Sequence, residues 1–238
     1  MRYVPEKIGN ITITNHYTQI KYLVDKFLNI SDIELIDDFD KRTRLMIFRG
    51  KLSGCYPENK NINLRLATIS TIWKIPDYKK YYDVGLSKLY NSIIVENHIY
   101  NKDDDPKNDV ELLRKDYPYL TKYIVDVLPI NKLLSNYQFV LSIDGYVSAW
   151  RLPYELLMGN VVFVLTQYTT WFSDLLMDNI NCIKISNINL LHERYMSIYN
   201  NIDLCHKISI GANSLGKKLF NKNFIYRRIL DSVLLTLS

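Results

Sequence analysis

Short apolar runs recur along this chain and are separated by polar turns and by segments with helical periodicity. Three runs stand out, at positions 45–48, 139–143 and 161–165, and the last of them contains no polar residue. Strands without polar alternation are typical of a parallel sheet that is covered by helices on both faces. Because helical segments follow these runs, the pattern predicts an α/β protein with a Rossmann-like parallel sheet flanked by helices.

The segment from 137 to 185 is the most informative about local structure. After its first strand, the turn residues at 144–148 predict a loop. We expect a helix to begin at Ser148, because Ser is a favourable N-cap residue and Pro153 is tolerated in a first helical turn. Gly159 suits the end of that helix, where a residue often takes a positive φ angle. An Asp-Gly pair alone would also fit a hairpin turn, but the capped helix favours a strand–loop–helix unit.

A loop of this kind can bind an anion. Gly145 and Ser148 would present backbone N–H groups, and Arg151, expected in the first helical turn, would add a bidentate cation at the positive end of the helix. Ligands of parallel α/β sheets bind beside the carboxyl ends of the strands, and the strand at 45–48 should end at Arg49 and Gly50. The pattern therefore predicts a nucleotide diphosphate site formed by two loops that are distant in sequence.

The remaining segments complete the predicted organisation. Helices are expected at 17–28, 64–72, 190–199, 204–219 and 224–237, and a second break between strand and loop at 81–85. The segment 101–109 is interpreted as a linker or excursion, because three consecutive aspartates followed by Pro106 disfavour regular structure. An acidic run can bind a hard cation, but one flanked by Asn, Lys and Pro is more typical of a solvated loop, so we expect no metal.

Composition limits the classes of function. With 47% hydrophobic and 23% charged residues, the 238-residue chain matches a soluble globular protein. The net charge of +5 is compatible with an acidic or phosphorylated partner, but Lys and Arg are scattered among Asp and Glu, so nucleic acid is not expected as a ligand. Three widely spaced cysteines, together with the lack of a signal sequence, a membrane-spanning run or a retention signal, predict a cytoplasmic protein.

At these same positions the sequence resembles glycosyltransferase family 90, which includes protein O-glucosyltransferases and fungal capsule xylosyltransferases. The similarity runs from about residue 45 to the C-terminus, and its most specific part is the long motif at 137–154. Shorter matching stretches lie at 47–50, 53–55, 63–65, 82–85, 159–162, 171–175 and 182–186. The resemblance implies a GT-B fold, in which residues 45–238 would be the nucleotide-sugar-binding domain and residues 1–44 a lead-in and remnant of the acceptor-side lobe.

The resemblance also implies a function. Members of the family transfer a sugar with inversion and without a bound metal; the donor here would be UDP-glucose or UDP-xylose, and the acceptor a hydroxyl of a glycan or protein. The implied donor-binding residues are Arg49, Gly50, Lys51, Ser53, Asp83, Gly145, Val147, Ser148, Ala149 and Arg151. Arg151 would neutralise the diphosphate, and N–H groups at 147–149 would hydrogen-bond it. Lys51 stands where the family often has arginine, so a point charge would replace a bidentate fork.

The catalytic base is not identified. The family places its general-base aspartate well before the strand that contains Phe48, and only 47 residues precede Phe48 in this chain. No aspartate in that stretch lies in a matching motif, so no residue is assigned as the base. Two alternatives stay open: a catalytically inactive donor-binding module that needs a partner chain for the acceptor half, and a basic protein that binds nucleotides or nucleic acid.

Overall fold

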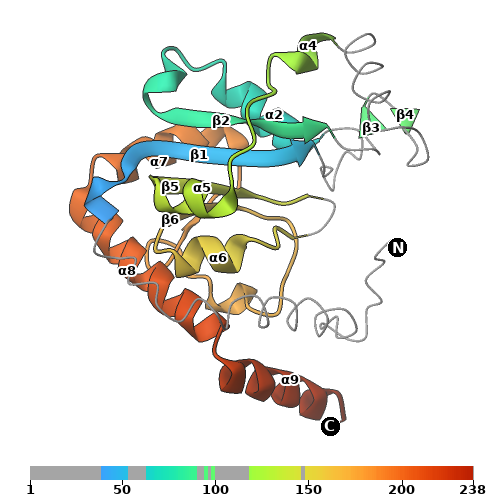
Figure 1. Cartoon of the computed structure of the whole chain (residues 1–238). Coiled ribbons are helices and arrows are strands. Elements are labelled where there is room, and N and C mark those ends of the chain that lie inside the picture. Colours follow the sequence, from blue (N-terminus) through green and yellow to red (C-terminus); the bar gives the residue numbers. More distant parts are fainter. Residues whose placement is uncertain are drawn as a thin grey trace.

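A five-stranded parallel sheet forms the centre of the fold. The computed structural model describes residues 39–52, 63–89, 94–95, 98–99, 118–145 and 148–237. The strands lie in the order β2-β1-β5-β6-β7, and a two-stranded antiparallel sheet pairs β3 with β4. Their bounds are Thr43–Leu52 (β1), Tyr82–Leu89 (β2), Ile94–Val95 (β3), His98–Ile99 (β4), Tyr137–Ile143 (β5), Val161–Leu165 (β6) and Ile183–Lys184 (β7). The sheet and its helices confirm the predicted α/β class (Figure 1).

Helices connect the strands and close the chain. The α-helices are α2 (Leu64–Ile72), α4 (Pro118–Thr121), α5 (Ile130–Ser135), α6 (Leu152–Leu157), α7 (Leu191–Tyr199), α8 (Ile202–Leu219) and α9 (Lys222–Leu237). The described residues also form the 3-10 turns η1 (Phe39–Lys41), η2 (Tyr78–Lys80), η3 (Ser173–Leu175) and η4 (Ile188–Leu190). In Figure 1, α9 extends away from the sheet beyond the end of α8.

The direction of winding reverses between β1 and β5. After β1 the chain adds β2 on one side, then returns to place β5 on the other side of β1 and continues outward to β6 and β7. In open parallel sheets, ligands bind in the crevice outside the carboxyl ends of the two strands that flank such a reversal. The topology therefore directs attention to the residues that follow β1 and β5.

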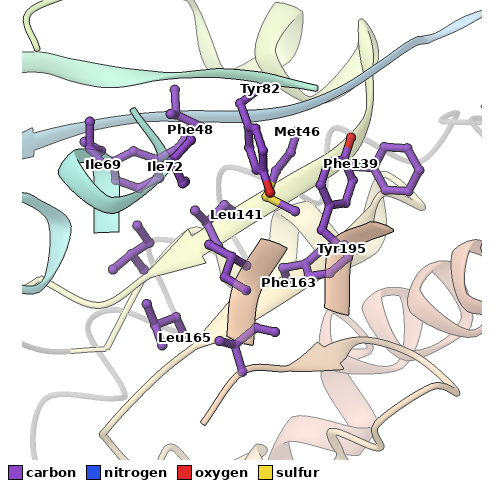
Figure 2. Packing of buried hydrophobic residues seen from close by; sticks show 14 of the residues in the cluster. Met46, Phe48, Ile69, Ile72, Tyr82, Phe139, Leu141, Phe163, Leu165 and Tyr195 are labelled. Atoms are coloured by element: carbon purple, nitrogen blue, oxygen red, sulfur yellow. The ribbon is translucent and has the colours of Figure 1, made fainter. Parts of the chain in front are cut away.

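One face of the sheet packs against α2 and α7. Its core includes Phe48, Phe139 and Phe163 from three adjacent strands, and Figure 2 shows Tyr195 of α7 beside the last two. The ring of Tyr195 meets those of Phe139 and Phe163 edge-on, with centroid separations of 5.2 and 5.6 Å, an arrangement that stabilises aromatic pairs. This packing ties α7 to the centre of the sheet.

The opposite face is covered by α5, α6 and α8. Ile47 and Val140 belong to a buried cluster with residues of α5 and α6, whereas Val162 lies in a cluster with residues of α6 and α8. Helix α8 approaches α6 closely because Gly216 has no side chain: a Cβ at this position would lie 2.3 Å from the Cα of Leu157. Contacts on two sides thus hold the short helix α6 in place.

Several predicted boundaries are confirmed. The helix expected at 64–72 coincides with α2, and its N-cap Asn63 accepts a hydrogen bond from Leu66 N at 3.0 Å. Gly159 follows α6 with a φ angle of +65°, as expected for a residue that ends a helix. The helices predicted at 190–199, 204–219 and 224–237 correspond to α7, α8 and α9.

Two predicted strand ends are wrong. The strand expected to stop at Arg49 continues to Leu52, and the break expected at 81–85 coincides with the start of β2, which contains residues 82–85. Gly50 fits a strand here because the ring of Phe48 occupies the space beside it, where a Cβ would lie 2.6 Å from the ring. Arg49 is accommodated in the strand because its guanidinium forms an ion pair with Asp83 of β2. The predicted strand end rested on local sequence alone, and the tertiary contacts of both residues override it.

The helix predicted to begin at Ser148 begins at Leu152, and Arg151 is its N-cap residue. The preceding residues stay in a loop because the side chain of Asp144 accepts a hydrogen bond from Ala149 N at 3.0 Å. Helix α6 consequently has six residues. The helix predicted at 17–28 and the linker predicted at 101–109 lie outside the described residues.

Candidate anion-binding site

An arginine from α2 joins the carboxyl ends of β1 and β5. Arg65 is the second residue of α2, and its guanidinium donates hydrogen bonds to the carbonyl of Lys51 at the end of β1 (2.9 Å). It also donates to the carbonyls of Ile143 (3.0 Å) and Asp144 (3.1 Å) at the end of β5. The side chain therefore spans the point at which the winding of the sheet reverses.

A second arginine reaches the same place from the other face of the sheet. Arg151 precedes α6, and its Nη1 donates to the carbonyl of Arg49. Its Nε lies 2.8 Å from Oε1 of Glu155, one turn further along α6. The guanidinium carbons of Arg151 and Arg65 lie 5.2 and 5.8 Å from the centroid of the buried Phe48 ring. Two cations thus share one aromatic side chain.

The proximity of the two arginines has an electrostatic cost. Burial and, second, the charge of Arg151 lower the pKa of Arg65 to about 10, whereas the charges of Asp144 and Glu155 oppose that shift. Arg65 still carries its charge near neutral pH. Because two like charges lie close together and partly desolvated, a negatively charged group placed between them would be stabilised.

Asp144 organises the loop that leads to Arg151. Its buried carboxylate accepts hydrogen bonds from Ala149 N (3.0 Å), from the Thr166 hydroxyl (2.6 Å) and from Gln167 N (2.7 Å). Burial raises the pKa of this carboxyl, and the three hydrogen bonds oppose the rise. The residue therefore fastens the loop after β5 to the loop after β6, and it uses the N–H of Ala149 that was predicted to bind a phosphate.

Arg49 and Asp83, both predicted as donor-binding residues, pair with each other. Arg49 Nη2 lies 2.5 Å from Asp83 Oδ1, and its other donors contact the carbonyls of Phe48, Asp83 and Asp126. The hydroxyl of Tyr137 donates to Asp83 Oδ2 at 2.6 Å. Burial and this hydrogen bond raise the pKa of Tyr137 to about 12. The side chain of Arg49 thus holds β1 against β2. The main-chain carbonyl of Arg49 accepts a hydrogen bond from Arg151.

The other predicted residues occupy varied positions. Gly50 lies beside Arg65, since a Cβ there would be 3.4 Å from Nη1. Lys51 has an exposed side chain, and its carbonyl accepts from Arg65. Gly145 and Ser148 lie in the loop after β5, whereas Ser53 and Val147 fall outside the described residues. The donor-binding role of the whole predicted set stays a prediction.

Sequence reasoning did not assign Arg65 or Glu155 to the site. Asn63 caps α2, so Arg65 was recognisable as a first-turn arginine that follows a buried strand, a position that faces the carboxyl end of a parallel sheet. Glu155 follows Arg151 by four residues, the spacing at which opposite charges meet on a helix. Both signals were present in the sequence.

The described ranges lack a metal-binding cluster, a helix able to cross a membrane and an exposed thiol. They contain no group of three or more His, Cys, Asp or Glu side chains arranged to hold a metal ion. Each helix in this part of the chain is too short or too polar to cross a lipid bilayer. Cys182 and Cys205 are buried free thiols, and burial raises the pKa of both, which disfavours the reactive thiolate.

Comparisons with known proteins give distant similarities. No family model matches the chain. Uncharacterized protein 035R of Invertebrate iridescent virus 3 is 24% identical over 237 residues, which cover 95% of this chain and 19% of that protein. The chain therefore spans about a fifth of the length of this relative.

Similar solved structures include Anabaena Alr3699/HepE in complex with UDP, which is 11% identical with a TM-score of 0.48, and the same protein in complex with UDP and glucose, 12% identical with a TM-score of 0.49. Both matches cover 91% of this chain and 52% of that one. A glycosyltransferase from Rickettsia africae is 17% identical, with a TM-score of 0.48, over 90% of this chain and 55% of the other. At these TM-scores the similarities assign no role to any residue of this chain.

Proposed function

We propose that this chain binds the diphosphate of a UDP-sugar at the carboxyl ends of β1 and β5, and that it is the donor-binding part of a glycosyltransferase. The observation that carries the proposal is the pair of guanidinium groups, Arg65 and Arg151, that meet beside Phe48 where the winding reverses. A diphosphate supplies the two neighbouring negative charges that such a pair stabilises best.

The arginines, rather than a helix end, are the basis of this proposal. Helix α6 has six residues, so the partial charge at its amino end is weaker than that of a long helix. Arg65 and Arg151 come from different faces of the sheet, and main-chain carbonyls hold both of them. Guanidinium groups fixed in this way need little reorganisation when charge builds on a leaving diphosphate, which is the requirement for transferring a sugar without a metal.

The sugar nucleotide is inferred from the sequence motif at 137–154, which resembles that of family 90 glycosyltransferases. The motif places β5, the loop held by Asp144, and Arg151 in one continuous stretch. On this basis the donor would be UDP-glucose or UDP-xylose, transferred with inversion to a hydroxyl acceptor. The acceptor half and the catalytic base would be provided by another part of the protein or by a partner chain.

Isothermal titration with UDP, UDP-glucose and GDP tests the proposal. Binding of both uridine ligands, unchanged by EDTA, is expected, and weaker binding of GDP would indicate selectivity for the base. No heat at millimolar ligand with folded protein would refute the proposal.

Variants locate the site. Arg65→Ala, and Arg151→Ala combined with Glu155→Gln so that no buried carboxylate is left unpaired, should each weaken UDP binding by roughly 1.5–3 kcal/mol, the range for hydrogen bonds to charged groups. Arg194→Ala is the matched control, because Arg194 pairs with Asp178 on the surface near α7. Equal affinity in all variants would place the ligand elsewhere. Incubation with labelled UDP-sugar and hydroxyl acceptors then separates a transferase from an inactive donor-binding module.

A further inference from the structure

Glu155 is a buried carboxylate that the proposed function does not use directly. Its side chain has no exposed surface, and Oε1 lies 2.8 Å from Arg151 Nε without the alignment of a good hydrogen bond. The hydroxyl of Ser142, at the end of β5, is also buried and lies close enough to act on Glu155, again without well-formed hydrogen-bond geometry. A carboxylate in this position depends on neighbouring positive charge to stay ionised.

The charges that act on Glu155 come from two elements. Arg151, at the start of α6, is the closer one, and Arg65 of α2 acts from the opposite side of the sheet. Helix α8, which packs against α6, contributes neutral groups: Ser209 and Asn213 donate to the carbonyls of Gly159 and Leu157. Burial raises the pKa of Glu155, while the two arginines and Ser142 oppose the rise.

We propose that Glu155 takes up a proton when a nucleotide diphosphate binds, so that Glu155 couples donor affinity to pH. The proposal rests on the proposed function, because the same guanidinium groups would hold both the carboxylate and the diphosphate. An anion on Arg151 and Arg65 offsets the positive charge that favours the ionised form of Glu155, and the carboxylate then binds a proton from the bulk buffer. No covalent bond other than the O–H bond on Glu155 is formed.

The direction of the pH dependence follows from linkage. A ligand that binds together with a proton binds more weakly as pH rises, and one proton sets a limit of about tenfold in affinity per pH unit. The fall should occur between the pKa of Glu155 in the free protein and its higher pKa in the complex. Donor release would therefore be favoured on the alkaline side of this range.

Calorimetry of UDP-glucose binding in buffers of different ionisation enthalpy measures the proton directly. UDP-glucose is suitable because its diphosphate is a diester and has no group that titrates near neutral pH. At one or more pH values between about 5.5 and about 8.5, the observed enthalpy should change linearly with the buffer's ionisation enthalpy. The slope should correspond to uptake of up to about one proton.

Two variants test whether Glu155 is the group that takes up the proton. Glu155→Gln should bind UDP-glucose with no buffer-dependent enthalpy and no dependence of affinity on pH over this range. Glu193→Gln, which changes an exposed carboxyl in the first turn of α7, should keep the slope of the parent. Infrared difference spectra of the parent protein need no substitution, and they should show a protonated carboxyl band that appears on adding UDP-glucose.

The outcomes distinguish this inference from the proposed function. Binding of UDP-glucose without proton uptake at any pH in the range, or uptake that persists in Glu155→Gln, overturns the role of Glu155 and leaves the donor site standing. If Glu155→Gln does not fold, the infrared band decides, since its absence on binding overturns the inference. Absence of any binding would overturn both proposals together.

Discussion

Arg151→Ala should lower the stability of the chain by an amount that depends on pH. The substitution removes the guanidinium that lies 2.8 Å from Glu155 and leaves a fully buried carboxylate without its ion-pair partner. Breaking a buried pair in this way costs ~3–5 kcal/mol. Because Glu155 can bind a proton instead, the contribution of the unpaired carboxylate to this loss at neutral pH is at most about 3.7 kcal/mol, the cost of protonating a carboxyl whose ordinary pKa is about 4.3.

The sign of the pH effect is fixed by proton binding. Burial raises the pKa of Glu155 and Arg151 opposes that rise, so removing Arg151 should raise the pKa further; the folded variant should then hold on Glu155 a proton that the unfolded state releases. The free energy of unfolding of this variant should therefore fall as pH rises above about 4.3, by at most about 1.4 kcal/mol per unit, until the folded pKa is reached. Arg151→Ala combined with Glu155→Gln has no carboxyl at this position, so it should regain stability near neutral pH and lack the added slope.

Urea unfolding followed by circular dichroism, at about pH 5.5 and about pH 7.5, tests this expectation for the parent and both variants. Arg194→Ala is the control, and the loss of this surface ion pair should cost less than about 1 kcal/mol at both pH values. If the unfolding free energy of Arg151→Ala stays parallel to that of the parent at the two pH values, the claim that Arg151 opposes the rise in the pKa of Glu155 is refuted.

Two further predictions concern packing and thiol chemistry. Gly216→Ala should destabilise the chain by roughly 1–3 kcal/mol despite the better helix propensity of Ala, because the new Cβ would lie 2.3 Å from Leu157 Cα. An unchanged melting temperature would contradict this packing. Cys182 and Cys205 should react with iodoacetamide far more slowly in the folded chain at about pH 8 than in urea, because both are buried and burial raises the pKa of their thiols to about 12 and 11. Peptide mass spectrometry measures each site, and equal rates in both states would show that the thiols are accessible.

The fold was predictable where local signals and tertiary packing agree. The apolar run at 161–165 predicted a buried parallel strand, and the helix predicted at 64–72 coincides with α2. Local signals failed at Arg49 and Gly50, where a strand end was predicted but β1 continues, because Asp83 on the neighbouring strand neutralises the arginine. That pairing depends on strand order, which a single sequence does not specify.

The candidate site was predictable only where its residues are close together in the sequence. Arg151 was recognised because its loop, helix start and motif lie in one continuous stretch. Arg65 was left out of the predicted set, since its contacts with the carbonyls after β5 exist only when α2 lies across the reversal point. Glu155 was overlooked because an i,i+4 ion pair is normally a surface feature, and its burial results from the approach of α8 and the sheet.

The contacts that orient the two arginines make the arrangement tolerant of sequence change. Arg65 donates to the main-chain carbonyls of Lys51, Ile143 and Asp144, and Arg151 donates to that of Arg49. A carbonyl is present whatever side chain the residue carries, so substitutions at the ends of β1 and β5 could accumulate without removing these acceptors. Distant relatives of this chain should therefore share two arginines, one after each of the strands that correspond to β1 and β5 and flank the reversal in winding. The residues of the strands themselves need not be similar.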